Sequence, residues 1–492
     1  MANNFKNDDS FLRKLVIGAA GTEKTLNEMK KMGFVPIELE RGSTGYKIWK
    51  EIKIKRIRVP DILCLKTGLR VESRGKTSAE ISMSHSLKKS ERAWDFGMRN
   101  NDYVSIIVFG QNPDSAIDVR VCSPVHFIKV EDLRKVYGKK QVEISTPKGV
   151  EEGSEIRVIW TSASAKEVSF VEEVNSDTII LRSKSENKPQ RIKLHRNKKG
   201  NPYQLLPQVQ AGELVEANQI VASVVPVYKE LSITASQYDF LSDLKSCLLS
   251  ERYAAAKALR FLGYSGKGKK LLIDRVNNAN EDIYVRLEAA AALAKFEHCE
   301  GWDFLEKKLN PSHPCEPLDT QLETIIVLSE LRISRSQTAL IKVLKDTNRN
   351  EELRAGAAWG LGQFSSVKSA TALVDTFNQC SLSVKVESAR ALLNIACDQT
   401  PALLKMFKKA GGQEQAGISW ALAKVGHFNP QMILQKDNQN LRMWLAYILG
   451  YGKNNFSEDN LKSISQNDPE VYFAASVLWQ ILDSWINNLR EY

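Results

Sequence analysis

A short helical pattern recurs through the second half of the chain and limits its fold more than any other feature. Each copy begins with a basic or polar residue and continues through small residues to a leucine, as in residues 286–293 and 354–361. Small residues let neighbouring helices approach closely, and leucine at every third or fourth position forms a buried stripe. Helical repeats of about 30–40 residues stack into an α-solenoid. The eight copies begin at Arg252, Arg286, Gln321, Arg354, Lys385, Gln415, Arg442 and Tyr472.

The order Arg-x-x-Ala-x-x-Ala-Leu in these copies resembles that of HEAT-like repeats. The resemblance covers residues 236–492 and implies an array that binds a protein partner or nucleic acid and has no chemistry of its own. Three tryptophans, Trp359, Trp420 and Trp444, fall at helical spacing inside the copies, where core packing is expected.

A second informative segment lies near the N-terminus, where two carboxylates stand beside short apolar runs. Residues 62–65 predict a buried strand, residues 66–68 a tight turn and residues 69–76 a return strand. A hairpin of this kind brings Asp61 and Glu72 together at one end.

The return strand of this hairpin also carries basic side chains. Because side chains alternate along a strand, Arg70, Glu72, Arg74 and Lys76 are expected on one face. Carboxylate oxygens bind hard cations such as Mg²⁺, and basic groups neutralise a phosphodiester under attack. The simpler interpretation is that Asp61 caps a strand end and Glu72 pairs with a neighbouring arginine.

These residues resemble the PD-(D/E)xK nuclease superfamily, which includes restriction endonucleases and Holliday-junction resolvases. Pro60 and Asp61 match the first half of the motif, and Glu72, Ser73 and Arg74 stand where Glu-x-Lys is expected. The resemblance implies Mg²⁺ or Mn²⁺ as the cofactor.

The surrounding sequence extends this resemblance over about residues 9–135 and implies an α/β restriction-endonuclease-like domain in residues 1–140. A first helix would include Gly21 to Phe34, with Glu23 as a further metal ligand beside Asp61 and Glu72. The resemblance also implies a helix over residues 84–100 and core strands over residues 104–109 and 125–130.

One residue departs from the family pattern, because Arg74 replaces its lysine. Arginine keeps the charge but substitutes poorly for a compact ammonium. Lys76 lies two residues further on the same face and is expected to supply the catalytic cation. The departure is also what a catalytically inactive, DNA-binding domain of this fold would show.

Basic residues favour an anionic partner, which we expect to be DNA. The net charge is +11, and residues 41–76 contain eleven basic residues against three acidic ones. A second basic stretch, residues 182–199, contains eight basic residues and one acid. Solvated charged strands are the alternative in both places. The expected DNA contacts are Lys53, Lys55, Arg56, Arg58, Arg191, Lys193, Arg196, Lys198 and Lys199.

Residues 141–235 predict a small β-rich domain between the nuclease-like segment and the repeats. Short alternating runs at residues 156–160, 168–171 and 178–181 are separated by turn signals. Residues 212–222 are similar to the hammerhead turn of barrel-sandwich hybrid domains. We therefore expect a small β-barrel with a basic hairpin.

The cysteines and the apolar runs predict a cytoplasmic protein. The seven cysteines are dispersed and form no Cys-x-x-Cys pair, as expected for free thiols in a reducing compartment. The polar start does not resemble a signal peptide, and no apolar run reaches the ~18 residues that a membrane span needs.

Together these features predict a multidomain, Mg²⁺-dependent DNA endonuclease, with a helical-repeat platform for a partner or substrate, in defence, restriction or repair. The alternative is a catalytically inactive nuclease-fold scaffold whose HEAT-like array assembles a protein complex. RNA is a third candidate ligand, since surfaces that contact the backbone do not exclude it. The sequence leaves the oligomeric state open, a homodimer included.

Overall fold

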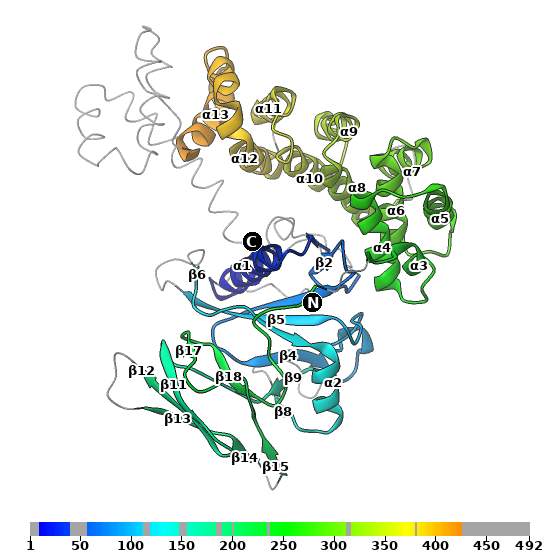
Figure 1. The fold of residues 1–492 in the computed structure, drawn as a ribbon. Helices are drawn as coiled ribbons and strands as arrows, with labels where there is room; N and C mark the ends of the chain where they lie inside the picture. The colour runs from blue at the N-terminus through cyan, green and yellow to red at the C-terminus, as the bar shows by residue number, and fades with distance from the viewer. Residues whose placement is uncertain are drawn as a thin grey trace, which may run out of the picture. The chain divides into compact units, whose positions relative to one another are not determined.

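The computed structural model describes two compact units, which divide after Tyr264. Figure 1 shows a β-rich first unit and a stack of helices in the second. No helix in the described ranges is both long enough and apolar enough to span a membrane. The described residues are 9–39, 57–111, 119–146, 155–183, 189–198, 201–233, 237–310, 316–378 and 381–425.

The first unit begins with a helix packed on a sheet. The strand order is β1-β2-β3-β5-β6, and β7 also pairs with β5. The first three strands are antiparallel, whereas β3 and β5 are parallel. The elements are α1 (Asp9–Lys31), β1 (Pro36–Glu38), β2 (Ile62–Cys64), β3 (Arg70–Lys76), β5 (Tyr103–Gln111), β6 (Val119–Val121) and β7 (His126–Lys129). The strands expected over residues 104–109 and 125–130 are confirmed, and so is the first helix.

Helix α1 packs very closely against β3 because glycines face each other where they meet. Its buried stripe runs through Ile17, Gly21, Thr25 and Met29, one residue per turn. A Cβ atom added at Gly75 would lie 2.3 Å from the carbonyl oxygen of Ile17. The contact therefore requires glycine on β3.

The helix expected over residues 84–100 is wrong. This region contains strand β4 (Ile81–Ser86) and a 3-10 turn, η2 (Ser90–Arg92). Ile81 and Met83 alternate with serines, and this period of two places both apolar side chains in the core. The polar composition of the segment concealed the alternation.

The middle segment is β-rich, but its described strands form no closed barrel, which corrects the expected barrel. Strands β8 and β9 join β4 in one sheet, and the remaining strands form the sheets β10-β18-β16, β13-β12-β11-β17 and β14-β15. In each of these orders with three or more strands, the first and last strands do not pair with each other, so none of the described sheets closes on itself. The elements are α2 (Val130–Gly138), β8 (Glu143–Ser145), β9 (Glu155–Trp160), β10 (Ser162–Ser164), β11 (Ser169–Val174), β12 (Thr178–Ser183), β13 (Gln190–Lys193), β14 (His195–Lys198), β15 (Asn201–Gln204), β16 (Leu206–Pro207), β17 (Leu214–Val215) and β18 (Ile220–Ser223).

One hydrophobic core joins the middle segment to the segment before residue 140. It contains Trp94 and Val104 from the one, and Trp160 and Val221 from the other. Because β4 pairs with β9 as well, the strands on both sides of residue 140 belong to one packed body.

The second unit is a stack of paired helices, as the repeat pattern predicts. Helices α6, α8, α10 and α12 pack in succession, and α7, α9 and α11 form a second row (Figure 1). The elements are α5 (Gly266–Asn277), α6 (Ile283–Lys295), α7 (Cys299–Leu309), α8 (Leu318–Leu331), α9 (Ser334–Lys345), α10 (Glu351–Leu361), α11 (Val367–Val374), η3 (Asp375–Asn378), α12 (Leu382–Phe407) and α13 (Gly412–Val425).

Six of the eight predicted repeat copies coincide with helices. The first is α4 (Leu249–Leu262), which with α3 (Phe240–Asp243) belongs to the first unit, and the others are α6, α8, α10, α12 and α13. Trp359 is buried, as expected for a core residue. The side chain of Trp420 is not described, and the copies that begin at Arg442 and Tyr472 lie outside the described residues, as does Trp444.

We predict that Gly75→Ala destabilises the first unit by about 1–3 kcal/mol, because the added methyl group meets backbone that cannot move aside. Gly18→Ala is the matched control, since a Cβ there meets no atom of the described chain within 4 Å. Alanine should be neutral or stabilising at this helical position. Urea unfolding of both variants checks this, and equal midpoints would show that α1 does not pack on β3 as described.

Candidate functional site

The predicted hairpin is present and sets its two carboxylates opposite each other. Strands β2 and β3 pair antiparallel, with Ile62 opposite Val71 and Leu63 opposite Arg70. One further step in this register places Asp61 opposite Glu72. The strand that follows Asp61 is fully buried, so the core fixes where the carboxylate stands.

Both carboxylates have partners on the same hairpin. The Oδ2 atom of Asp61 accepts a 2.6 Å hydrogen bond from the backbone N–H of Ser73. The Oε1 atom of Glu72 lies 2.6 Å from Nη2 of Arg74. Charge-assisted contacts of this length hold both groups in place. Arg74 thus contacts the second acid of the hairpin.

Lys76 lies further along β3 and is held by β4. Its Nζ atom donates to the carbonyl oxygen of Ser82 at 2.7 Å and to Ser82 Oγ at 3.0 Å. Burial, helped by the positive charges of Arg157 and Arg74, lowers the pKa of Lys76 to about 8. The amine of Lys76 therefore changes its protonation state closer to neutral pH than an ordinary lysine does, and such lowered pKa values are common at functional sites.

Arg157 joins Lys76 and Ser82 at this site, although the sequence did not single it out. It lies on β9, where Nε donates to Ser82 Oγ at 3.0 Å and Nη2 lies 2.9 Å from Oε1 of Glu80. The alternation of Ile156 and Val158 around Arg157, matched with that on β4, was the available signal. The pairing of this run with β4 is hidden in the sequence, because the polar residues 84–100 predict a helix.

The acidic pair fits one mode of magnesium binding. Mg²⁺ keeps several waters and is commonly bound by one or two carboxylates together with substrate phosphates. Asp61 and Glu72 can supply those carboxylates. Glu23, the third expected ligand, is exposed on α1. The described residues contain no group of three His, Cys, Asp or Glu that could hold a metal ion, so Glu23 does not complete a site with Asp61 and Glu72.

The expected DNA contacts are only partly described. The exposed ones are Arg58, Arg191, Lys193 and Arg196, and the last lines a shallow hollow of about 410 Å³ on the β14–β15 hairpin, with His195, Asn197, Tyr203 and Gln204. Lys198 lies on β14, but its side chain is not described. Lys53, Lys55, Arg56 and Lys199 lie outside the described residues.

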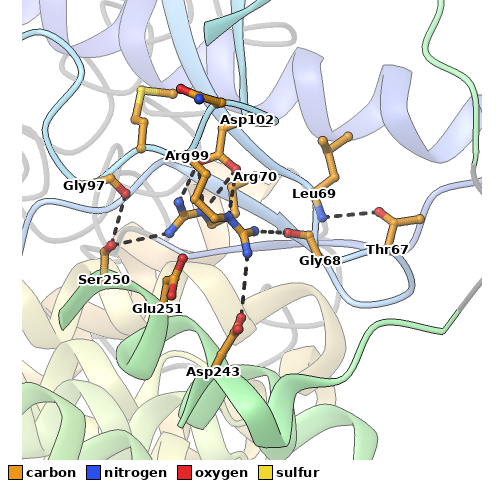
Figure 2. Close-up of polar contacts among 12 residues, drawn as sticks. Thr67, Gly68, Leu69, Arg70, Gly97, Arg99, Asp102, Asp243, Ser250 and Glu251 are labelled. Atoms are coloured by element: carbon orange, nitrogen blue, oxygen red, sulfur yellow. Dashed lines mark hydrogen bonds and ion pairs between the residues drawn. The ribbon is translucent and has the colours of Figure 1, made fainter. Parts of the chain in front are cut away.

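Arg70 was expected on the basic face but lies in a buried ion pair instead. Its Nη2 atom is 2.6 Å from Oδ2 of Asp102, and both side chains are only 1% exposed. Its Nη1 atom also reaches Ser250 Oγ on α4 at 3.5 Å, and that hydroxyl donates to the carbonyl oxygen of Gly97 at 3.0 Å (Figure 2). Arg70 is therefore not available to a ligand.

Arg99 extends this network to the residues before α4. Its guanidinium donates to the carbonyl oxygen of Gly68 at 2.5 Å and to the Tyr238 hydroxyl at 2.6 Å, and lies 3.7 Å from the carboxylate of Asp243. Figure 2 shows Arg99 between Gly68 of the hairpin turn and Asp243. These contacts explain why α3 and α4 belong to the first unit, although the sequence predicts a helical domain that begins at residue 236.

No protein-family model matches this chain, and no curated protein does. Among solved structures, it is similar to the complex of CpcE and CpcF of phycocyanin lyase from Nostoc sp. PCC7120, at 17% identity over 51% of this chain and 98% of that chain, with a TM-score of 0.25. A Kap121p mutant matches at 12% identity over 48% of this chain and 30% of its own, with a TM-score of 0.28. Human deoxyhypusine hydroxylase matches at 15% identity over 50% and 83%, with a TM-score of 0.18. Similarities this distant carry no inference about activity.

We predict that Arg70→Ala lowers the free energy of unfolding by about 3–5 kcal/mol, because it leaves the carboxylate of Asp102 buried without its partner. Arg134→Ala is the matched control. Arg134 pairs with Asp95 at 2.7 Å and also donates to Asn100 and to the carbonyl oxygen of Met98, but its side chain is 32% exposed, so water can replace these contacts and its loss should cost clearly less than that of Arg70. Chemical denaturation measures both, and equal losses would contradict the buried pair.

Proposed function

We propose that this chain is a metal-dependent DNA endonuclease that hydrolyses phosphodiester bonds. One observation carries the proposal. Asp61 and Glu72 stand opposite each other on paired strands, and Lys76 follows on the same strand as Glu72. Two carboxylates with a nearby cation match the needs of metal-assisted phosphodiester hydrolysis.

The order and pairing of the elements support a nuclease-like fold as part of this proposal. A helix, three antiparallel strands and a parallel fourth strand follow one another in α1, β1, β2, β3 and β5. The PD-(D/E)xK resemblance implies the first helix, the hairpin and the core strand over residues 104–109 in this order. The connection between β3 and β5 departs from it, since it contains β4 where a helix was expected.

In the proposed reaction each side chain has a separate task. Asp61 and Glu72 would hold the metal ion, which lowers the pKa of a bound water and neutralises charge on the phosphate. Lys76, an ammonium below a pH of about 8, would stabilise negative charge on the attacked phosphate. Arg74 would orient Glu72 through their ion pair.

A catalytically inactive DNA-binding scaffold is the second candidate. It is favoured by the engagement of both carboxylates with groups of the chain itself, the Ser73 amide and the Arg74 guanidinium. In that case the helical array would be the working part. In either case we propose that the array of α5 to α13 binds a protein partner, since stacked repeats present an extended surface.

We predict that purified protein cleaves plasmid DNA with Mg²⁺ or Mn²⁺ and that EDTA stops the reaction. Asp61→Ala and Glu72→Ala should each reduce cleavage by more than about 100-fold. Loss of a group that only holds a metal ligand in place costs up to about 100-fold, and loss of the ligand itself should cost more. Glu131→Ala is the control, because it removes an ion-paired carboxylate from helix α2 of the same unit. DNA binding without cleavage by the parent protein would favour the scaffold. Full cleavage by either site variant would reject the assigned pair.

We also predict that Lys76→Ala reduces cleavage by about 10²–10³-fold, the usual effect of losing one charge-stabilising group. Arg74→Ala should cost less, about 10-fold, because Arg74 orients Glu72 and does not contact the reacting phosphate in this proposal. Single-turnover cleavage rates at pH 7 decide between the two residues. The opposite ranking would assign the family's lysine role to Arg74.

A further inference from the structure

Arg157 reaches the candidate site from a different part of the chain. Its Nε atom and the Nζ atom of Lys76 each lie 3.0 Å from the same acceptor, Ser82 Oγ. The serine therefore links a cation of β3 to a cation of β9. The two residues are far apart in sequence and adjacent in the folded unit.

Strand pairing fixes this arrangement. In the antiparallel β4–β9 pair, Ser84 stands opposite Arg157 and Met83 opposite Val158. Met83 and Val158 are buried in the core, so alternation places Ser82, Ser84 and Arg157 on the other face of the sheet. The pairing of these two strands thus fixes the position from which the Arg157 side chain extends.

Positive charge is concentrated on this side of the site. Arg74, Lys76 and Arg157 stand close enough that both guanidiniums help to lower the pKa of the lysine, whereas the carboxylate of Glu80 raises it. Like charges at close range destabilise each other, and a bound anion relieves that repulsion. Hydroxyl groups such as that of Ser84, which is exposed, are also common phosphate ligands.

We propose that Arg157 and Lys76 together bind a phosphate of the DNA backbone beside the carboxylate pair, so that the middle segment supplies part of the nuclease site. The proposal rests on the proposed function for the identity of its ligand. An arginine suits this role because its planar guanidinium can bind a phosphate through two parallel hydrogen bonds. The ion pair with Glu80 holds the side chain in place until the phosphate replaces or joins it.

The test is DNA binding by the full chain across a salt series, with EDTA present to prevent cleavage. The logarithm of the binding constant falls linearly with the logarithm of salt concentration, and each lost phosphate contact reduces the slope by about one. Arg157→Ala should reduce the slope by about one, and Arg157→Lys should restore it because the charge remains. Arg134→Ala removes a comparable ion-paired arginine from α2 and should leave the slope unchanged.

A second measurement reads the cluster without DNA. The pH dependence of acetylation at Lys76, followed by mass spectrometry, reports the pKa of its amine. Arg157→Ala should raise that pKa, since a nearby positive charge is lost, and Glu80→Gln should lower it, since a negative charge is lost. These opposite shifts would show that Arg157 and Glu80 both act electrostatically on Lys76, which the shared phosphate contact requires.

The outcomes separate this proposal from the proposed function. A protein that binds no DNA overturns both the nuclease and the phosphate as ligand. DNA binding with an unchanged slope in Arg157→Ala overturns the role of Arg157 alone, and so does an unchanged pKa of Lys76. An equal slope change in Arg134→Ala would show a general charge effect and would also overturn it.

Discussion

The buried ion pair between Arg70 and Asp102 is the contact on which the first unit depends. Burying two charges is costly unless their geometry is good and their remaining hydrogen-bonding groups are satisfied. Here Asp102 accepts from both Nε and Nη2 of Arg70 and also from the backbone N–H of Arg99 at 2.6 Å. The pair thereby joins β3 to the turn before β5, and Ser250 adds α4 to the same point.

This anchor bears directly on the candidate site. Arg70 lies two residues before Glu72 on one strand and opposite Leu63, two residues after Asp61, on the other. Holding Arg70 therefore holds the register that sets the two carboxylates against each other. The face of β3 changes along its length, from the buried Arg70 at one end to the partly exposed Lys76 at the other.

Features encoded by neighbouring residues were predictable from the sequence. The hairpin follows from an apolar run, a turn and an alternating strand, and α1 and the repeat helices follow from apolar stripes that extend over several turns. Strand β4 was not predictable in the same way, because only Ile81 and Met83 mark its alternation. Its partner strand β9, in which Trp160 stands opposite Ile81, is distant in sequence. Such long-range pairings leave no local pattern. The burial of Arg70 was equally hidden, since Asp102 comes from a separate turn.

The basic side chains of β3 are each held by a different partner. Arg74 contacts Glu72, whereas Lys76, two residues further along, is held by Ser82 and stands beside Arg157. The carboxylates come from a local hairpin, but the cations depend on a strand pairing across residue 140. A fragment that ended at residue 140 would keep both carboxylates but would lose β9, the partner strand of β4. If this chain cleaves DNA, the chemistry therefore requires the middle segment as part of the catalytic body and not only as an added DNA-binding domain.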